Sequence, residues 1–341
     1  MRDAPSQAQA AVGLRLAGAV WWFWHVRGYA SEGRDWLSRL LDTAGDVVDA
    51  ATQAKALRAA AGLAVGQNDL VAARLLIEQS LACAAELQDP MLLARSLTTR
   101  GSVCYALNDL AAARAAYTES LAIFRTVKNQ PGAAAALTGL GVVALGDDDL
   151  PAARTFFEDS LPIQRMLADP IAVAMTLANL GLLLMKMDDL TAARACVEEA
   201  VTLYRKFGDD ANTAQSLANL ARIASGQRDF RAAHALYRES ICMFRDLGPG
   251  KVGLVAQTLM YLAQSRTAAQ AWSDAARLIG HAERYGDDSR WVWDPEDRRV
   301  FDDVRATTRA SMKAGAFDAA CDEGRAMTLD EALRLQEPGP R

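Results

Sequence analysis

Apolar residues recur along the chain with helical spacing, in a unit that repeats every 40 residues. The unit is clearest at 137–161, where two short amphipathic segments are joined by a polar turn. The same turn signature recurs at Asp69-Leu70, Asp109-Leu110, Asp149-Leu150, Asp189-Leu190 and Asp229-Phe230. Self-similarity at a fixed period of this size is typical of solenoids, in which each repeat is one supersecondary unit. The pattern therefore predicts an all-α, right-handed solenoid of stacked helical hairpins.

Prolines and glycines place the boundaries between hairpins. Asp89-Pro90, Gln130-Pro131 and Asp169-Pro170 separate successive pairs, because the residue before proline resists helix and proline suits a helix start. About seven helix pairs are expected: a divergent one at 8–27 and 30–43, regular ones at 52–87, 92–128, 132–167, 172–207 and 212–247, and a last at 252–286. Terminal repeats are expected to be atypical. The expected organisation is a tail at 1–7, the solenoid at 8–286, a helical cap at 287–336 and a tail at 337–341.

Small and large residues alternate in fixed columns of the repeat. The first helix of a pair carries a small residue at Ala61, Gly101, Gly141, Gly181 and Ala221. The second helix carries Ala73, Ala113, Ala153, Ala193 and Ala233, and four residues later a large one at Ile77, Tyr117, Phe157, Val197 and Tyr237. Small residues set against large ones let antiparallel helices interlock. A further small column follows at Ser80, Ser120, Ser160, Ala200 and Ser240.

The C-terminal segment leaves the 40-residue period. Asp294-Pro295-Glu296 predicts the start of a helix to about 313, and a short helix is expected near 316–325. Thr328 and Glu331 form a capping-box pattern that opens a last helix to about 336.

Composition and charge argue against a nucleic-acid-binding or membrane-spanning protein. The net charge is −5, with acidic and basic residues interleaved, so no basic block predicts nucleic-acid binding. No run approaches the roughly 20 apolar residues of a membrane-spanning helix, and 16–24 lacks a convincing signal-peptide cleavage site. The five cysteines are widely spaced without a CxxC pair, which favours a reducing compartment. We therefore expect a cytoplasmic protein without membrane or direct nucleic-acid partners.

Candidate catalytic and metal motifs are weak. The glycines at 139, 141 and 146 lack the Lys-Ser/Thr of a phosphate loop, and Asp147-Asp148-Asp149 lacks the EF-hand spacing. The three histidines, His25, His234 and His281, have no partner at metal-ligand spacing. The sequence predicts no catalytic residue, cofactor or metal. An enzyme with a site assembled from scattered residues is the remote alternative.

The recurring columns resemble the tetratricopeptide repeat. The resemblance rests on a leucine and a glycine in the first helix, as at Leu137 and Gly141, and on alanine, an aromatic and a small residue in the second, as at Ala153, Phe157 and Ser160. It covers about 10–286. The period exceeds the usual 34 by six residues, which implies longer helices, as in kinesin light chain.

The two ends of the chain resemble a narrower group. LRLAGAVWWFWHVRGYASEGRDWL near the start, and ARLIGHAE (276–283) with Phe317, Glu323-Gly324-Arg325 and Thr328 near the end, resemble the repeat arm of bacterial STAND-class signal-transduction ATPases and LuxR-type regulators. In that family the arm senses an inducer or partner. Neither an ATPase nor a helix-turn-helix pattern is found in this sequence, so the resemblance implies a sensing or docking role, with a STAND-type ATPase or regulator as partner.

The first helices of a tetratricopeptide solenoid line its concave groove, which predicts the binding residues. Arginine and aromatic side chains around an apolar floor suit a peptide or an acidic segment. The predicted groove residues are Trp21, Trp24, Lys55, Arg58, Arg95, Ser102, Tyr105, Asn179, Lys186, Asn219, Arg222, Tyr261 and Gln264. The tryptophans suit a capping role equally well, because a terminal helix needs large side chains. The first hypothesis is a non-catalytic protein-interaction scaffold, and the alternative is a small-molecule sensor arm that controls a separate ATPase.

Overall fold

The computed structural model describes residues 6–26, 28–288 and 295–335. In these residues every regular element is a helix, and successive helices pair as hairpins, which confirms an all-α solenoid. The chain divides into two compact units, Met1–Leu183 and Leu184–Arg341, here called unit 1 and unit 2. Most of the tail expected at 1–7, and all of that expected at 337–341, lies outside the described residues.

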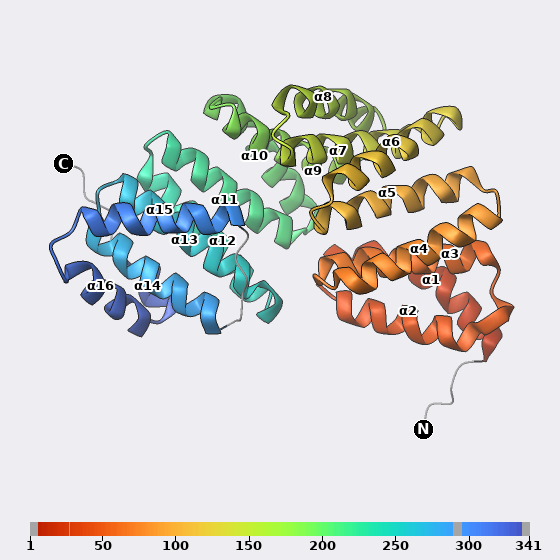
Figure 1. Cartoon of the computed structure of the whole chain (residues 1–341), viewed down its shortest axis with the longest axis horizontal. Helices are drawn as coiled ribbons and strands as arrows, with labels where there is room; N and C mark the ends of the chain where they lie inside the picture. The colour runs from red at the N-terminus through yellow and green to blue at the C-terminus, as the bar shows by residue number, and fades with distance from the viewer. Residues whose placement is uncertain (1–5, 27, 289–294, 336–341) are drawn as a thin grey trace. The chain divides into compact units, whose positions relative to one another are not determined.

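Figure 1 shows the helices in chain order, and neighbours such as α3 and α4 lie side by side as pairs. The hairpin helices agree with the predicted bounds to within two residues. They are α1 (Gln7–Val26), α2 (Ala30–Ala44), α3 (Ala50–Gly66), α4 (Leu70–Glu86), α5 (Pro90–Ala106), α6 (Leu110–Thr126), α7 (Gln130–Gly146), α8 (Leu150–Met166), α9 (Pro170–Lys186), α10 (Leu190–Phe207), α11 (Asp210–Gly226), α12 (Phe230–Asp246), α13 (Val252–Ala268) and α14 (Trp272–Asp288). Two short 3-10 helices lie at Gly45–Val47 and Pro249–Lys251.

A single kind of turn joins most of these helices and sets the period. From α3 to α9 each helix has 17 residues, and three residues separate it from the next. The last residue before each cap is left-handed, for example Asn68, Asn108 and Asp148 with φ near 60°. An aspartate then caps the following helix by accepting a backbone N–H, as Asp109 does from Ala112 at 3.0 Å. Two such steps of 20 residues make the repeat of 40, so the six extra residues lengthen the helices.

The small and large columns interlock as predicted. The ring of Tyr117 lies against Gly101 and Gly139, and the ring of Phe157 lies against Gly141, where a Cβ would overlap the aromatic carbons. Ala153 and Phe157 have no exposed surface. The glycines at 139 and 141 therefore admit aromatic side chains inside a helix, and they do not form a phosphate loop.

The serine column carries a hydrogen-bond ladder that the sequence pattern showed only as small residues. Each serine hydroxyl donates to the backbone carbonyl of the alanine 26 residues earlier, on the first helix of its own pair. The Oγ–O distances are 2.9 Å for Ser80–Ala54, 2.8 Å for Ser120–Ala94, 2.9 Å for Ser160–Ala134 and 2.7 Å for Ser240–Ala214. All four serines are fully buried. Each alanine carbonyl already accepts a backbone hydrogen bond within its own helix and accepts the serine bond in addition. The serine column therefore holds the two helices of each hairpin at a fixed distance.

Unit 2 ends in three further helices, α15 (Pro295–Ala310), α16 (Ala316–Ala326) and α17 (Leu329–Ala332). The capping box of Thr328 and Glu331 is confirmed, but the helix it opens is shorter than predicted. Helix α16 packs on α14, where Gly280 and Gly324 each face a backbone carbonyl of the other helix with no space for a Cβ. The C-terminal motifs of the narrower resemblance, at 276–283 and 323–325, therefore meet at this crossing, where Arg325 and Glu283 also form an ion pair at 2.7 Å.

The structure also bears on disulfides, metal sites and membrane-spanning helices. All five cysteines are free thiols. Among the described residues, no three His, Cys, Asp or Glu side chains are grouped so that they could hold a metal ion. Within the described ranges, no helix has the length and apolarity needed to cross a membrane.

Candidate functional site

The first helices α1, α3, α5 and α7 of unit 1 form a continuous face. Helix α3 contacts both α1 and α5, and α5 also contacts α7. The helices of this first-helix face, together with α9, carry the predicted groove residues of unit 1. They are Trp21 and Trp24 on α1, Lys55 and Arg58 on α3, Arg95, Ser102 and Tyr105 on α5, and Asn179 on α9.

Four of these residues form a basic cluster, defined here as Trp21, Lys55, Arg58 and Arg95. The guanidinium carbon of Arg58 lies 5.9 Å from the ring centroid of Trp21, within range of a cation–π contact. Lys55 is one helical turn before Arg58 and is exposed. Arg95 is exposed on the neighbouring helix and acts electrostatically on Arg58. The cluster therefore joins three positive charges and one aromatic ring from three helices.

The charge of Arg58 is poorly compensated. Its Nε is buried and has no hydrogen-bond partner among the described residues, and no carboxylate there pairs with its guanidinium. Burial, followed by the charge of Arg95, lowers the pKa of Arg58 to about 10. The group stays protonated at neutral pH, since that value remains well above 7. A cation that is partly removed from water without a counter-charge is unfavourable, so an anion bound at this point would be stabilised.

Trp21 and Trp24 also have a packing role. Both pack against the buried cluster of α1, α2 and α3, where Trp24 covers Gly33 and Trp21 covers Gly62. Each side chain remains partly exposed. The two expectations for these residues are thus compatible, because one edge of Trp21 covers the core and its ring also contacts Arg58.

The remaining groove residues of unit 1 lie apart from the basic cluster. The hydroxyl of Ser102 is 2.8 Å from that of Tyr117, so it shares a hydrogen bond with the hairpin core. Tyr105 lies over Gly146 at the end of α7, with 39% of its surface exposed. Asn179 on α9 is half-buried. These residues offer polar and aromatic surface along the same face without adding charge.

In unit 2 the predicted residues meet a carboxylate of the chain itself. The guanidinium of Arg222 lies 4.6 Å from the ring centroid of Tyr261, and the hydroxyl of Tyr261 donates to Asp297 at 2.7 Å. Gln257 also donates to Asp297, from the helix α13 that α15 packs against. This pairing could not be predicted from the sequence, because a helix-start signal near 294–296 does not say which helix α15 covers.

The other unit 2 residues divide by accessibility. Asn219 is buried, with 4% of its surface exposed, whereas Lys186 and Gln264 are exposed. Tyr261 is therefore already in contact with an acidic side chain, whereas among the residues that the structure describes no carboxylate pairs with the basic cluster of unit 1.

Comparison with known proteins identifies the repeats. Residues 92–166 and 172–246 match the tetratricopeptide repeat model, so the chain carries tetratricopeptide repeats. No curated protein matches the sequence.

Several solved structures share the fold at low sequence identity. A signal transduction ATPase with numerous domains from Pyrococcus horikoshii, which has a tetratricopeptide repeat sensor, is 13% identical with a TM-score of 0.60; the match covers 86% of this chain and 43% of that one. A Rap protein complexed with Competence and Sporulation Factor is 10% identical with a TM-score of 0.57, over 89% of this chain and 100% of that one. BtubC from P. vanneervenii is 20% identical with a TM-score of 0.50, over 64% and 89%. At these identities the similarity shows the fold.

Proposed function

We propose that this tetratricopeptide-repeat chain is a non-catalytic interaction scaffold that docks an acidic peptide segment of a partner protein on the first-helix face of unit 1. The observation that carries the proposal is the basic cluster, in which Arg58 lies between a tryptophan and a second arginine without a carboxylate partner. A carboxylate of the partner binds Arg58 and Arg95, and Trp21 contributes apolar contact area.

The chemistry of the cluster favours a carboxylate ligand over an apolar one. A guanidinium donates two parallel hydrogen bonds to a carboxylate, and such charge-assisted bonds are among the stronger ones in proteins. The site is also preorganised, since packing against Gly62 holds Trp21 in place and α3 is a fully formed helix. Less conformational entropy is lost when the ligand binds to a preorganised surface.

The setting that we propose is bacterial signal transduction in the cytoplasm, with a STAND-type ATPase or a regulator as the partner. Fold similarity to a protein with a tetratricopeptide repeat sensor, and to a Rap protein in complex with a signalling factor, supports this setting. The same similarity supports the second candidate, a sensor arm whose small-molecule ligand controls a separate ATPase. A ligand that binds the isolated chain before any protein partner would favour that second candidate.

Binding of matched peptides tests the scaffold proposal. The probe is an array of peptides in pairs, in which glutamates of one member are replaced by glutamine in the other. The chain should bind the glutamate members more tightly. The double variant Arg58→Glu, Arg95→Glu should lose that preference, because the charge that attracts the carboxylate is reversed. Loss of one charge-assisted pair corresponds to about tenfold in affinity.

The matched control is Arg125→Glu together with Arg165→Glu, which alters two arginines on second helices without changing the basic cluster. This control should keep the wild-type preference. Circular dichroism should show unchanged helicity in both variants. If the double variant in the cluster binds the glutamate and glutamine members as the wild type does, the proposal is wrong.

A further inference from the structure

A row of arginines on the second helices links successive repeats. Arg34 on α2 donates to Gln67 at 2.7 Å and to Asp69 at 2.8 Å, both in the next hairpin. Arg114 on α6 donates to Asp147 at 2.8 Å, and Arg194 on α10 donates to Gln227 at 2.7 Å. In each case an acceptor lies 33 residues after the arginine, in the turn of the following repeat. The period thus predicts an acceptor at position 107 for Arg74.

This turn acceptor is missing for Arg74 on α4 and for Arg154 on α8, where position 187 is Met187; Arg154 pairs with Glu158 on its own helix. Position 107 is occupied by Leu107, whose side chain cannot accept a hydrogen bond. Asp109 is the equivalent of Asp69, and both carboxylates accept a backbone N–H of the helix that follows, but only Asp69 also accepts from an arginine. Within the described residues Arg74 makes no hydrogen bond or ion pair. Its guanidinium is therefore available, in contrast to those of Arg34, Arg114 and Arg194.

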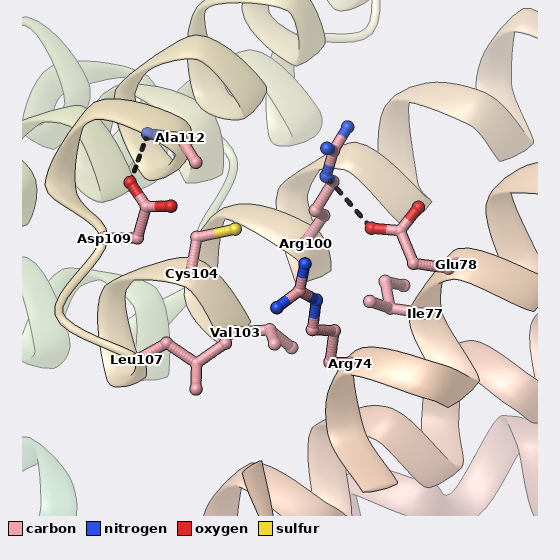
Figure 2. A pocket seen from close by; sticks show the side chains of 9 residues that line it. All are labelled: Arg74, Ile77, Glu78, Arg100, Val103, Cys104, Leu107, Asp109 and Ala112. Atoms are coloured by element: carbon pink, nitrogen blue, oxygen red, sulfur yellow. Dashed lines mark hydrogen bonds and ion pairs between the residues drawn. The ribbon is translucent and has the colours of Figure 1, made fainter. Parts of the chain in front are cut away.

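A cavity of about 300 Å³ lies beside Arg74, between α4, α5 and the start of α6. Figure 2 shows Arg74 reaching from α4 toward the middle of the lining side chains, with Cys104 and Leu107 on one side and Ile77 on the other. Of the apolar lining residues, Leu107 is 39% exposed, whereas Ile77 and Val103 lie beneath the surface and are almost fully buried. The volume is at the lower end of the range for small-molecule sites.

Substitutions in the repeat columns explain why the cavity opens at this hairpin. Ile77 occupies the column that holds Tyr117 and Phe157 in the next two repeats, so a smaller side chain fills that space. Arg100 occupies a column that is apolar at Leu140 and Leu220. Arg100 Nε lies 3.3 Å from a carboxylate oxygen of Glu78 in an ion pair. The cavity is therefore a local departure of one hairpin from the pattern that its neighbours follow.

We propose that this cavity binds a small organic carboxylate, which the guanidinium of Arg74 holds while the side chain of Leu107 contacts its apolar part. Glu78 pairs with Arg100, and Asp109 accepts the backbone N–H of Ala112 through one of its oxygens, so among the described residues neither carboxylate pairs with Arg74. A bound carboxylate takes the place of the turn acceptor that Arg34, Arg114 and Arg194 have. The site lies on α4, α5 and α6 and is separate from the basic cluster, so it is independent of the proposed function.

Cys104 lines the cavity and serves as an internal reporter. The probe is benzoate, with benzamide as its uncharged counterpart, at constant ionic strength. The rate of alkylation of Cys104 by iodoacetamide is measured by peptide mass spectrometry on the full chain. The reaction is run at a pH of about 9, since burial raises the pKa of the thiol. We expect benzoate to slow alkylation of Cys104 saturably and benzamide to have little effect. Cys83, which does not line the cavity, provides the reference rate.

Two variants decide the role of Arg74. Arg74→Gln should weaken protection by benzoate about tenfold, the effect of losing one charge-assisted pair. Arg114→Gln removes the equivalent arginine of the next repeat and should leave protection unchanged. Arg74 is exposed and has no partner among the described residues, so its replacement should preserve helicity. The proposal is overturned if benzoate gives no saturable protection of Cys104 or if benzamide protects Cys104 equally well. It is also overturned if benzoate protects Cys104 as strongly in the Arg74→Gln variant as in the wild type.

Discussion

At the residue scale, the position of a charged side chain in the repeat can be read from the sequence. Whether that side chain has a partner depends on the helices that pack around it. The column position of Arg58 on the first-helix face could be predicted from the sequence. Its lack of a carboxylate partner could not, because that depends on which side chains converge from α1 and α5. Asp297 shows the converse case. It lies in the C-terminal segment, where the 40-residue pattern has ended, so no repeat column connects it to Gln257, which it contacts.

His281 provides a pH-dependent test at this scale. The ring is fully buried on α14, and its Nδ1 lies 3.3 Å from the carbonyl oxygen of Gly324 on α16. Burial, and then the charge of Arg284, lower the pKa of His281 below its usual 6.5. The unfolded chain therefore binds more protons than the folded one as pH falls below about 6.5, so the histidine destabilises the fold there. We expect the free energy of unfolding of unit 2 to fall between about pH 7 and 5.5.

Urea unfolding followed by hydrogen exchange in α14 and α16 measures this effect. His281→Gln should flatten the dependence over that interval, since glutamine does not titrate. His25→Gln, in unit 1, is the control and should keep it. An unchanged pH dependence in the His281 variant would show that another group is responsible.

At the element scale, the helical hairpins were largely predictable from the sequence. The packing of the C-terminal helices on those hairpins was not. Helix bounds followed from the period, the prolines and the aspartate caps, because each of these acts on neighbouring residues. The interlocking columns, such as Gly141 with Phe157, were also predictable, since small and large residues alternate in register. The hydrogen bonds of the serine ladder were not predicted, because the size pattern does not distinguish a serine from an alanine in that column. The packing of α15 on α13 is set by contacts between distant segments.

Ala153 tests the close crossing of α7 and α8. It has no exposed surface and packs among Ala144, Phe157 and Leu183. Ala153→Leu should lower the free energy of unfolding by about 1–3 kcal/mol, because the larger side chain overpacks the crossing. Ala115→Leu, at an exposed position of α6, is the matched control and should change stability by no more than about 0.5 kcal/mol. A neutral Ala153→Leu in urea titrations would mean that the columns are in the wrong register.

At the scale of the whole molecule, repeat arrays are stabilised by contacts between nearest neighbours. Stability is then approximately a sum of terms for each repeat and for each interface. The resemblance predicted this architecture across 10–286, and the repeat model matches within it at 92–166 and 172–246. The division into units at Leu183 and Leu184 has no signal in the sequence, since the 40-residue period continues through it.

Phe244→Ala tests how far a local defect spreads. Phe244 on α12 is 1% exposed in the core of unit 2, and its truncation should cost about 3–5 kcal/mol. Hydrogen exchange should quicken in α11, α12, α13 and α14, which share that core, and stay unchanged in α3 and α4. An equal loss of protection in all of these helices would contradict nearest-neighbour stabilisation.

The uniform turn between helices bears on how such a chain can change in length. Positions 68, 88, 108, 128, 148, 168 and 188 share a left-handed backbone, each followed by a capping side chain. After duplication or deletion of a block of 40 codons, the helices on either side of the new junction would still be joined by the same kind of turn. Gene rearrangement could therefore add or remove hairpins without inventing a linker, whereas a gain or loss of one codon would misalign every contact at that joint.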